Sequence, residues 1–303
     1  MTTHETYDVV ILGSGPAGLQ AGIHAARKNV RTLMLGRMDN SSLYWAHIEN
    51  YCCQFKVSGE EVLNTGREQV EAFGGEFRDE DVLSIDPEGS LFSIRLESGD
   101  TVLSKTVILA TGSSRNKLGV PGEKELLGKG VSYCVDCDAG FYRGQIVAVA
   151  GSRSAAAGGA VALTRFASEV HLYCDKLDVA DGLRRQLDET GVVLHEGVQI
   201  TEIRGETGVD AVALDDTTTR AVSGVFIELG AKGVLELTAT LGVTLDESMK
   251  YIDTDKKQRT NIPGIFAAGD ICGPPLQMAK AVGEGCVAGI EAANYAKKLT
   301  HGS

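Results

Sequence analysis

Short runs of apolar, mostly β-branched residues alternate along the chain with stretches rich in Ala and Gly. The order strand, turn, helix, strand occurs near residues 7–35 and again near residues 146–173. Each occurrence predicts a βαβ unit, in which a right-handed crossover joins parallel strands. We therefore expect an α/β fold with two nucleotide-binding-type domains built on parallel sheets.

The domain limits follow from where the apolar strands end. An apolar strand over residues 106–109 runs into a tight turn, and we place the first boundary near residue 115. Residues 261–270 look like a return to the first domain. The expected arrangement is one domain of residues 1–115 and 247–303, with residues 116–246 inserted as the second domain.

Charge, the length of the apolar runs and cysteine usage limit the partners and the location that we expect. The formal charge of −12, with no basic patch, disfavours nucleic acid and anionic membrane surfaces. The longest apolar runs fall well short of the roughly 20 residues that a membrane helix needs. The start of the chain does not have the pattern of a secretory leader, and its seven cysteines do not suggest a secreted disulfide framework. We expect a cytoplasmic location.

The first βαβ unit contains a glycine fingerprint. Directly after the strand that ends at Leu12, the sequence has the form G-x-G-x-x-G and then enters a helix; its residues are Gly13, Ser14, Gly15, Pro16, Ala17 and Gly18. The first glycine permits the turn, the second lets the backbone approach a pyrophosphate, and the third allows close packing of helix on strand. This context predicts a Rossmann-like domain that binds a dinucleotide, but it does not distinguish FAD from NAD.

A C-x-x-C motif, Cys134 and Cys137, has two common interpretations. Zinc needs further Cys or His ligands at short spacing, and none follows, so we expect no metal. A redox pair needs only the two sulfurs, one as attacking thiolate and the other to resolve. We favour the redox pair. Cys52 and Cys53 are adjacent, which leaves an accessory redox pair open.

The whole chain resembles the low-molecular-weight thioredoxin reductases. The match is carried mainly by residues 130–138, 141–144 and 266–270. The resemblance implies FAD in the first domain and an NAD(P)-binding-like second domain that carries the C-x-x-C pair. It further implies that Cys137 lies nearest the flavin, that Cys134 attacks a disulfide substrate such as a thioredoxin-like protein, and that Asp138 is the acid–base group. A homodimer is implied as well. The residues expected to line the FAD site beyond the first glycine loop are Arg37, Glu49, Asn50, Ala110, Thr111, Gly112, Gly269, Asp270, Gln277, Met278 and Ala279.

The second nucleotide site departs from the family pattern. Arg153 stands where a glycine normally lets the pyrophosphate approach the backbone, and Asp175 would repel the 2′-phosphate of NADPH. The sequence also resembles pyridine-nucleotide-independent relatives, whose donor is ferredoxin or a second flavin. Tyr44 and Trp45 form an aromatic pair that could stack on a further ring system or pack at an interface.

We therefore expect an FAD-dependent disulfide oxidoreductase for which NADPH is a doubtful donor, with ferredoxin or a second FAD in its place. Tyr44, Trp45 and Arg153 are the candidates for a second nucleotide site. The alternatives left open are an enzyme that uses NADH or NADPH, and a flavin-binding redox sensor without turnover.

Overall fold

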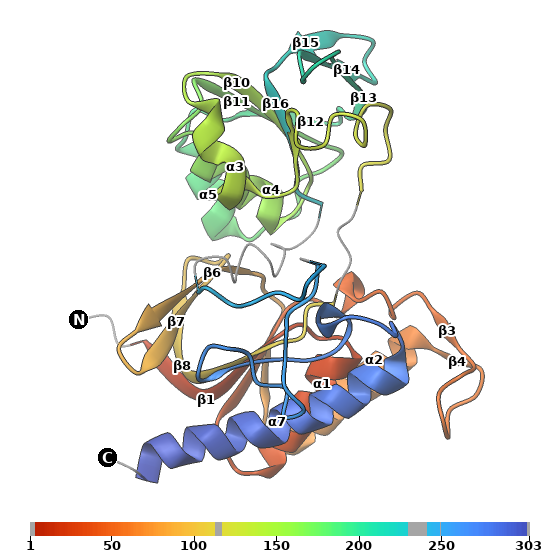
Figure 1. The fold of residues 1–303 in the computed structure, drawn as a ribbon, viewed down its shortest axis with the longest axis vertical. Helices are drawn as coiled ribbons and strands as arrows, with labels where there is room; N and C mark the ends of the chain where they lie inside the picture. Colours follow the sequence, from red (N-terminus) through yellow and green to blue (C-terminus); the bar gives the residue numbers. More distant parts are fainter. Residues whose placement is uncertain (1–3, 113–116, 230–240, 249, 302–303) are drawn as a thin grey trace. The chain divides into compact units, whose positions relative to one another are not determined.

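The chain forms two compact units in the computed structural model, which describes residues 4–112, 117–229, 241–248 and 250–301 (Figure 1). Unit 1 consists of Met1–Leu96, Asp100–Ser114 and Leu237–Ser303, and unit 2 of Glu97–Gly99 and Arg115–Glu236. Each unit contains a sheet with parallel strands and helices beside it. The predicted α/β class with Rossmann-like units is confirmed. The expected domain limits of 116–246 stay a prediction.

Unit 1 is built on a seven-stranded sheet with the order β5-β2-β1-β8-β7-β6, in which β17 also pairs with β8. Its parallel strands are β1 (Glu5–Leu12), β2 (Thr32–Leu35), β5 (Glu76–Arg78), β8 (Thr101–Leu109) and β17 (Ile265–Ala267). An antiparallel hairpin, β6 (Val82–Glu88) and β7 (Leu91–Leu96), pairs with the first part of β8. A separate ribbon consists of β3 (His47–Ile48) and β4 (Val57–Ser58).

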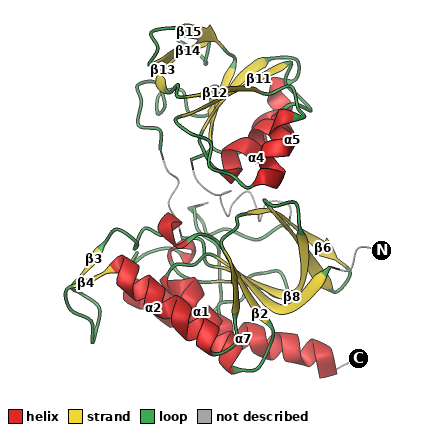
Figure 2. Cartoon of the chain, turned by 180° about the vertical axis from the view of Figure 1, so that it is seen from behind, coloured by secondary structure: helices red, strands yellow, loops and turns green. Residues whose placement is uncertain are grey.

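In the part of unit 1 that the structure describes, the helices are α1 (Pro16–Arg27), α2 (Gly59–Ala72) and α7 (Met278–His301), with short 3-10 turns η1 (Met38–Asn40) and η3 (Asp270–Cys272). Helix α1 packs against both α2 and α7 (Figures 1 and 2). A Cβ atom at Gly285 or Gly289 of α7 would lie 2.1 or 2.3 Å from a carbonyl oxygen of α1, so these glycines permit close helix contact. Among the described residues, no helix has both the length and the apolar character to cross a bilayer.

Unit 2 has a five-stranded sheet with the order β12-β11-β10-β16-β9. The strands are β9 (Val131–Ser132), β10 (Ile146–Ala150), β11 (Glu169–Cys174), β12 (Val193–Glu196) and β16 (Gly224–Ile227). Among the described residues of this unit, the helical segments are α3 (Val135–Asp138), η2 (Ala139–Tyr142), α4 (Ser154–Leu163) and α5 (Asp181–Asp188). A three-stranded antiparallel sheet, β13 (Ile200–Arg204), β14 (Ala211–Leu214) and β15 (Thr219–Ala221), shares a hydrophobic core with β10, β11 and β16.

A pair of histidines lies within the core sheet of unit 2. Nδ1 of His171 on β11 is 3.0 Å from Nε2 of His195 on β12. Burial lowers the pKa of both imidazoles below 6.5, and the charge of Arg220 lowers it further, while Glu169 opposes the shift at His171. One ring nitrogen must donate and the other accept, so the contact requires that His171 and His195 are not both charged.

This pair predicts a loss of stability in acid. The unfolded chain takes up protons first as the pH falls below 6.5, so each histidine lowers the free energy of unfolding by up to about 1.4 kcal/mol per pH unit in that range. We expect hydrogen-exchange protection of β11 and β12, corrected for intrinsic rates, to fall between pH 6.5 and 5. His195→Gln should make this dependence less steep, and β1 of unit 1 is the internal control. An identical pH dependence in the variant would contradict the assignment.

Candidate active site

The first glycine loop connects β1 to α1 without a side chain that caps the helix. Gly15 is the N-cap residue, Pro16 takes the first helical position, and the first turn has no acidic residue. Gly13 has φ +108°, and a Cβ atom there would lie 2.3 Å from the carbonyl oxygen of Ala110. A Cβ atom at Gly18 would lie 1.9 Å from the carbonyl oxygen of Gly13. The loop therefore requires glycine at two positions, and the start of α1 presents backbone N–H groups to which an anion can bind.

Other predicted residues lie at the same edge of the sheet. Ala110 directly follows β8 and donates its N–H to Leu12 at 2.8 Å, with Thr111 and Gly112 next in the chain. Gly269 follows β17, and a Cβ atom there would lie 2.8 Å from Cβ of Ala17. The ends of β1, β8 and β17 thus meet beside α1. The carboxyl edge of parallel strands is where α/β folds bind their ligands.

Two residues that the sequence analysis did not single out fix the turn at Gly269. Nζ of Lys280 donates to the carbonyl oxygen of Gly269 and to Oε2 of Glu284, each at 2.9 Å. The same carboxylate oxygen accepts from the N–H of Gly269 at 2.8 Å. Burial raises the pKa of the neighbouring Asp270, which the positive charge of Lys280 opposes. This network holds Asp270 at the start of η3.

The remaining predicted FAD-site residues fall into two groups. Asn50, after β3, donates from Nδ2 to Oε1 of Gln277 at 3.1 Å, although 227 positions separate them. Glu49 is exposed beside Asn50, and Met278 and Ala279 begin α7. Arg37 lies after β2, where its Nη1 is 2.9 Å from Oδ2 of the buried Asp81. The structure thus brings Asn50 and Gln277 together, while a protein carboxylate already pairs with Arg37.

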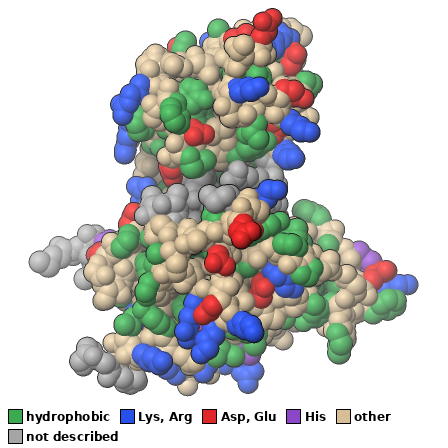
Figure 3. Space-filling view, viewed as in Figure 1, with side chains coloured by type: hydrophobic (Ala, Val, Ile, Leu, Met, Phe, Trp, Pro, Cys, Tyr) green, Lys and Arg blue, Asp and Glu red, His purple; other side chains and the backbone are tan. Residues whose placement is uncertain are grey.

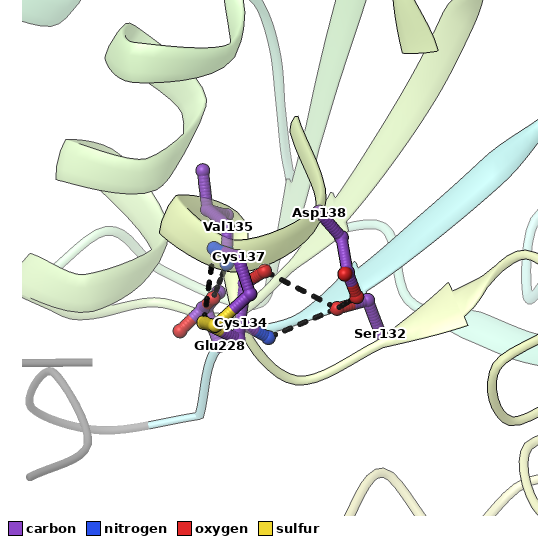
Figure 4. Close-up of a disulfide and its surroundings, with 6 residues drawn as sticks. All are labelled: Ser132, Cys134, Val135, Cys137, Asp138 and Glu228. Carbon is purple, nitrogen blue, oxygen red and sulfur yellow. Dashed lines mark hydrogen bonds between the residues drawn. A yellow bond between two sulfur atoms is a disulfide. The ribbon is translucent and has the colours of Figure 1, made fainter. Parts of the chain in front are cut away.

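In unit 2 the predicted redox pair is a disulfide between Cys134 and Cys137 at the start of α3 (Figure 4). Cys134 is buried and is the N-cap residue, and its sulfur accepts from the N–H of Cys137 at 3.1 Å. Cys137 is exposed. The helix spans a single turn, so the two sulfurs lie on one short rigid segment. Such a pair can open and close with little movement of the backbone.

Asp138 is linked to the backbone of Cys134 through a buried hydroxyl. Oγ of Ser132 donates to Oδ2 of Asp138 at 2.6 Å and accepts from the N–H of Cys134 at 3.0 Å (Figure 4). Asp138 therefore reaches the backbone of Cys134 by way of Ser132, which the sequence analysis did not single out. These hydrogen bonds orient the Asp138 carboxylate, as its proposed acid–base role requires.

A second carboxylate, Glu228, lies on the other side of this helical turn. Only 5% of Glu228 is exposed, and its Oε1 accepts from the N–H of Val135 at 3.2 Å. Val135 directly follows Cys134, and Figure 4 draws the carboxylate at the same end of α3 as the Cys134 sulfur. The contact spans 93 positions, from α3 to the residue after β16, so no local sequence signal could have identified it.

The second glycine loop, between β10 and α4, lies beside acidic residues of the segment that follows β11. Gly151 has φ +150°, and Arg153 is the N-cap residue of α4. Nε of Arg153 is 3.7 Å from Oδ2 of Asp178, whose own N–H donates to the carbonyl oxygen of Ser152 at 2.7 Å. Asp175 is exposed at the end of β11. A carboxylate thus lies beside the helix N-terminus at which a Rossmann-like unit binds a pyrophosphate.

The aromatic pair proposed for a second nucleotide lies in unit 1, between η1 and β3. The rings of Tyr44 and Trp45 are 4.9 Å apart with an edge-to-face angle of 74°. The Tyr44 hydroxyl donates to Glu60 at 2.7 Å, whereas Trp45 is 84% exposed. The Trp45 ring is therefore open to solvent, whereas the hydrogen bond to Glu60 fixes the Tyr44 ring.

Glycine-rich nucleotide loops in both units and a short helix with a disulfide define a class of disulfide oxidoreductase. The model of the pyridine nucleotide-disulphide oxidoreductase family matches residues 7–285, and the chain belongs to this family.

Relatives and solved structures agree with this class. The chain is similar to the thioredoxin reductase of Bacillus subtilis (strain 168), with 36% identity over 315 residues that cover 99% of this chain and 98% of the relative. It is also similar to the crystal structure of the atypical thioredoxin reductase TRi from Desulfovibrio vulgaris Hildenborough, with 35% identity, a TM-score of 0.82, and coverage of 98% and 99%. A ferredoxin-flavin thioredoxin reductase from Clostridium acetobutylicum has 32% identity, a TM-score of 0.70, and coverage of 99% and 100%.

Membership of this family implies FAD as the cofactor, and the first glycine loop fits it. The helix α1 has no side-chain cap and no acid in its first turn. A Cβ atom at Gly15 would meet only Ser41, 3.3 Å from its Oγ, so the backbone there is open to a ligand. The chain is therefore a flavin-dependent, thioredoxin reductase-like disulfide oxidoreductase.

Proposed function

We propose that this chain reduces the disulfide of a thioredoxin-like protein, or of a small substrate, through Cys134 and Cys137, with electrons from a donor other than NADPH. The single observation that carries the donor part is the pairing of Arg153 with Asp178 at the start of α4. A long side chain and a carboxylate occupy the place where a pyrophosphate needs bare backbone and a positive potential. The similarity to a ferredoxin-flavin thioredoxin reductase favours ferredoxin as the donor.

The roles within the pair follow the family resemblance. Cys134 attacks the substrate disulfide and Cys137 resolves it, while Asp138, oriented by Ser132, moves the proton at the thiols. Bound FAD would supply the two electrons that convert the Cys134–Cys137 disulfide back to two thiols. Because Cys134 is buried in the disulfide form, the pair must open before a protein substrate can reach it.

An exposed aromatic ring lies close to the pair in the chain. Phe141 of η2 is 75% exposed, four positions after Cys137. Large exposed aromatic side chains are enriched at protein interfaces. We assign Phe141 to the contact with the partner protein.

Rapid mixing with nicotinamide nucleotides tests the donor. We expect NADPH and NADH at about 0.1 mM, a typical KM range, to leave the flavin absorbance unchanged over seconds. Dithionite-reduced protein should then reduce thioredoxin, and Cys134→Ser should lower that rate by about 10³-fold or more. Rapid bleaching by either nucleotide would refute the donor part, and reduced protein that leaves every disulfide intact would favour a redox sensor without turnover.

A second flavin in place of NADPH is the other candidate donor. The open ring of Trp45, 84% exposed, favours it because aromatic faces stack on isoalloxazine-like rings. Flavin content after denaturation distinguishes the two, since one flavin per chain supports ferredoxin and two support the second flavin. The cytoplasmic location and the homodimer stay predictions.

A further inference from the structure

The hairpin of β3 and β4 ends in a turn made of two adjacent cysteines. The N–H of Gln54 donates to the carbonyl oxygen of Tyr51 at 3.1 Å, and these two residues pair as an isolated bridge. Cys52 and Cys53 are therefore the central residues of a four-residue turn. Cys53 has φ +68°, a conformation that costs residues other than glycine about 1–2 kcal/mol. The turn thus holds a cysteine where glycine or asparagine is usual.

The two sulfur atoms lie within reach of one another and of solvent. Sγ of Cys52 is 3.4 Å from Sγ of Cys53, and both residues are exposed. A disulfide bond is about 2.05 Å long, so its formation needs the sulfurs to approach by about 1.4 Å.

Two other free cysteines differ from this pair in chemistry. Burial raises the pKa of Cys174 to about 11 and that of Cys272 to about 12. Thiols with such values carry almost no thiolate near neutral pH, and the thiolate is the nucleophile in disulfide exchange. Cys52 and Cys53, in contrast, are open to a reagent from solvent.

An exposed aromatic side chain follows the turn. Phe55, two positions after Cys53 in the chain, is 70% exposed, and hydrophobic side chains reach the surface over this hairpin (Figure 3). A large apolar ring beside a reactive sulfur is suited to a protein substrate, because it supplies contact area around the reacting atoms.

We propose that Cys52 and Cys53 form a second thiol–disulfide exchange site, which takes the disulfide of a partner protein. The thiolate of one cysteine attacks the partner disulfide, and one partner sulfur leaves as a thiolate that takes a proton. The other cysteine then attacks the mixed disulfide, which forms the Cys52–Cys53 bond and releases the partner as a dithiol. Two electrons and two protons pass to the partner.

Ring strain sets the direction in which this site operates. A disulfide between adjacent cysteines is strained, and strained disulfides are the easily reduced, exchange-prone ones. The pair is therefore a dithiol in reducing conditions and transfers electrons only to partner disulfides of comparable or higher potential. It returns to the dithiol by exchange with a more strongly reducing dithiol.

The test uses the full-length holoprotein with Cys134→Ser and Cys137→Ser, so its outcome is independent of the proposed function. After equilibration with oxidised glutathione, acid quenching and alkylation, we expect the peptide containing Cys52 and Cys53 to be two hydrogens lighter and to lack the alkyl label. Dithiothreitol should reverse this. With Cys53→Ser added, a mixed disulfide with glutathione should accumulate at least tenfold over the parent. Two thiols that stay alkylatable, or lasting glutathione adducts in the parent, would overturn the proposal.

A second arm tests the protein partner. With oxidised protein disulfide isomerase as the probe, whose disulfide has a higher potential than that of glutathione, adding Phe55→Ser to the Cys53→Ser variant should slow mixed-disulfide formation severalfold and leave the rate with oxidised glutathione unchanged. The matched control is Phe73→Ser, which replaces an exposed aromatic ring at the end of α2 and should alter neither rate. Equal rates with protein disulfide isomerase, with and without Phe55→Ser, would exclude a protein partner at this hairpin.

Discussion

Replacement of Gly18 by alanine is expected to lower the free energy of unfolding of unit 1 by about 3 kcal/mol or more and to release most of the flavin. The added Cβ atom would lie 1.9 Å from the carbonyl oxygen of Gly13, so α1 would have to move away from β1. That movement displaces the helix N-terminus on which the pyrophosphate site depends. Flavin absorbance per chain after gel filtration, and the urea concentration at which flavin is released, measure the effect.

The matched control is Gly283→Ala in α7. Gly283 is an exposed helical glycine, and a Cβ atom there would meet nothing within 4 Å. Alanine stabilises a helix by about 1 kcal/mol relative to glycine, so this variant should keep its flavin and be as stable as the parent or more so. Equal flavin retention in Gly18→Ala and Gly283→Ala would contradict the role of the first glycine loop.

Glu228→Gln is expected to lower the pKa of the Cys134 thiol by about 1 unit or more, because it removes a buried negative charge at the start of α3. Glutamine can still accept from the N–H of Val135, so the hydrogen bond at 3.2 Å is kept. At neutral pH the thiolate fraction, and with it the rate of alkylation of Cys134, should rise about tenfold. The measurement is the pH dependence of alkylation in a Cys137→Ser background, where peptide mass spectrometry reports Cys134 alone.

Two companion variants separate charge from structure. Glu228→Ala leaves the N–H of Val135 without this acceptor and should cost about 1–3 kcal/mol of stability. Asp136→Asn removes an exposed carboxylate from the same helical turn, where salt and water screen its charge, and should change the Cys134 pKa little. If Glu228→Gln and Asp136→Asn gave the same alkylation profile, the buried carboxylate would have no special influence on the pair.

The features that the sequence predicted are those in which local residues determine local structure. The loop from Gly13 to Gly18 and the Cys134–Cys137 pair are short segments, and each requires its residue types at a fixed spacing. The parallel strands were predicted from their apolar runs, which are also local features of the sequence. The structure adds the steric demand, since Gly13 and Gly18 lie too close to backbone oxygens for any side chain.

What the sequence did not predict depends on contacts between distant segments. Glu228 reaches Val135 only because β16 lies beside β9 in the sheet. Lys280 and Glu284 hold Gly269 because α7 begins next to the end of β17. Arg153 was recognised as a departure from the usual loop, but its partner Asp178 comes from the segment after the next strand. No spacing rule along the chain encodes these pairs.

The contact of α7 with α1 has a consequence for the order of events during synthesis. Gly285 and Gly289 pack onto Ala17 and Ala21, so the first and last helices of unit 1 complete one core. A ribosome makes the whole of unit 2 before it makes α7. Unit 2 can therefore fold on the nascent chain, while unit 1 waits with β1 and α1 incomplete until α7 emerges. Flavin uptake at the first glycine loop is then an event that follows the synthesis of α7.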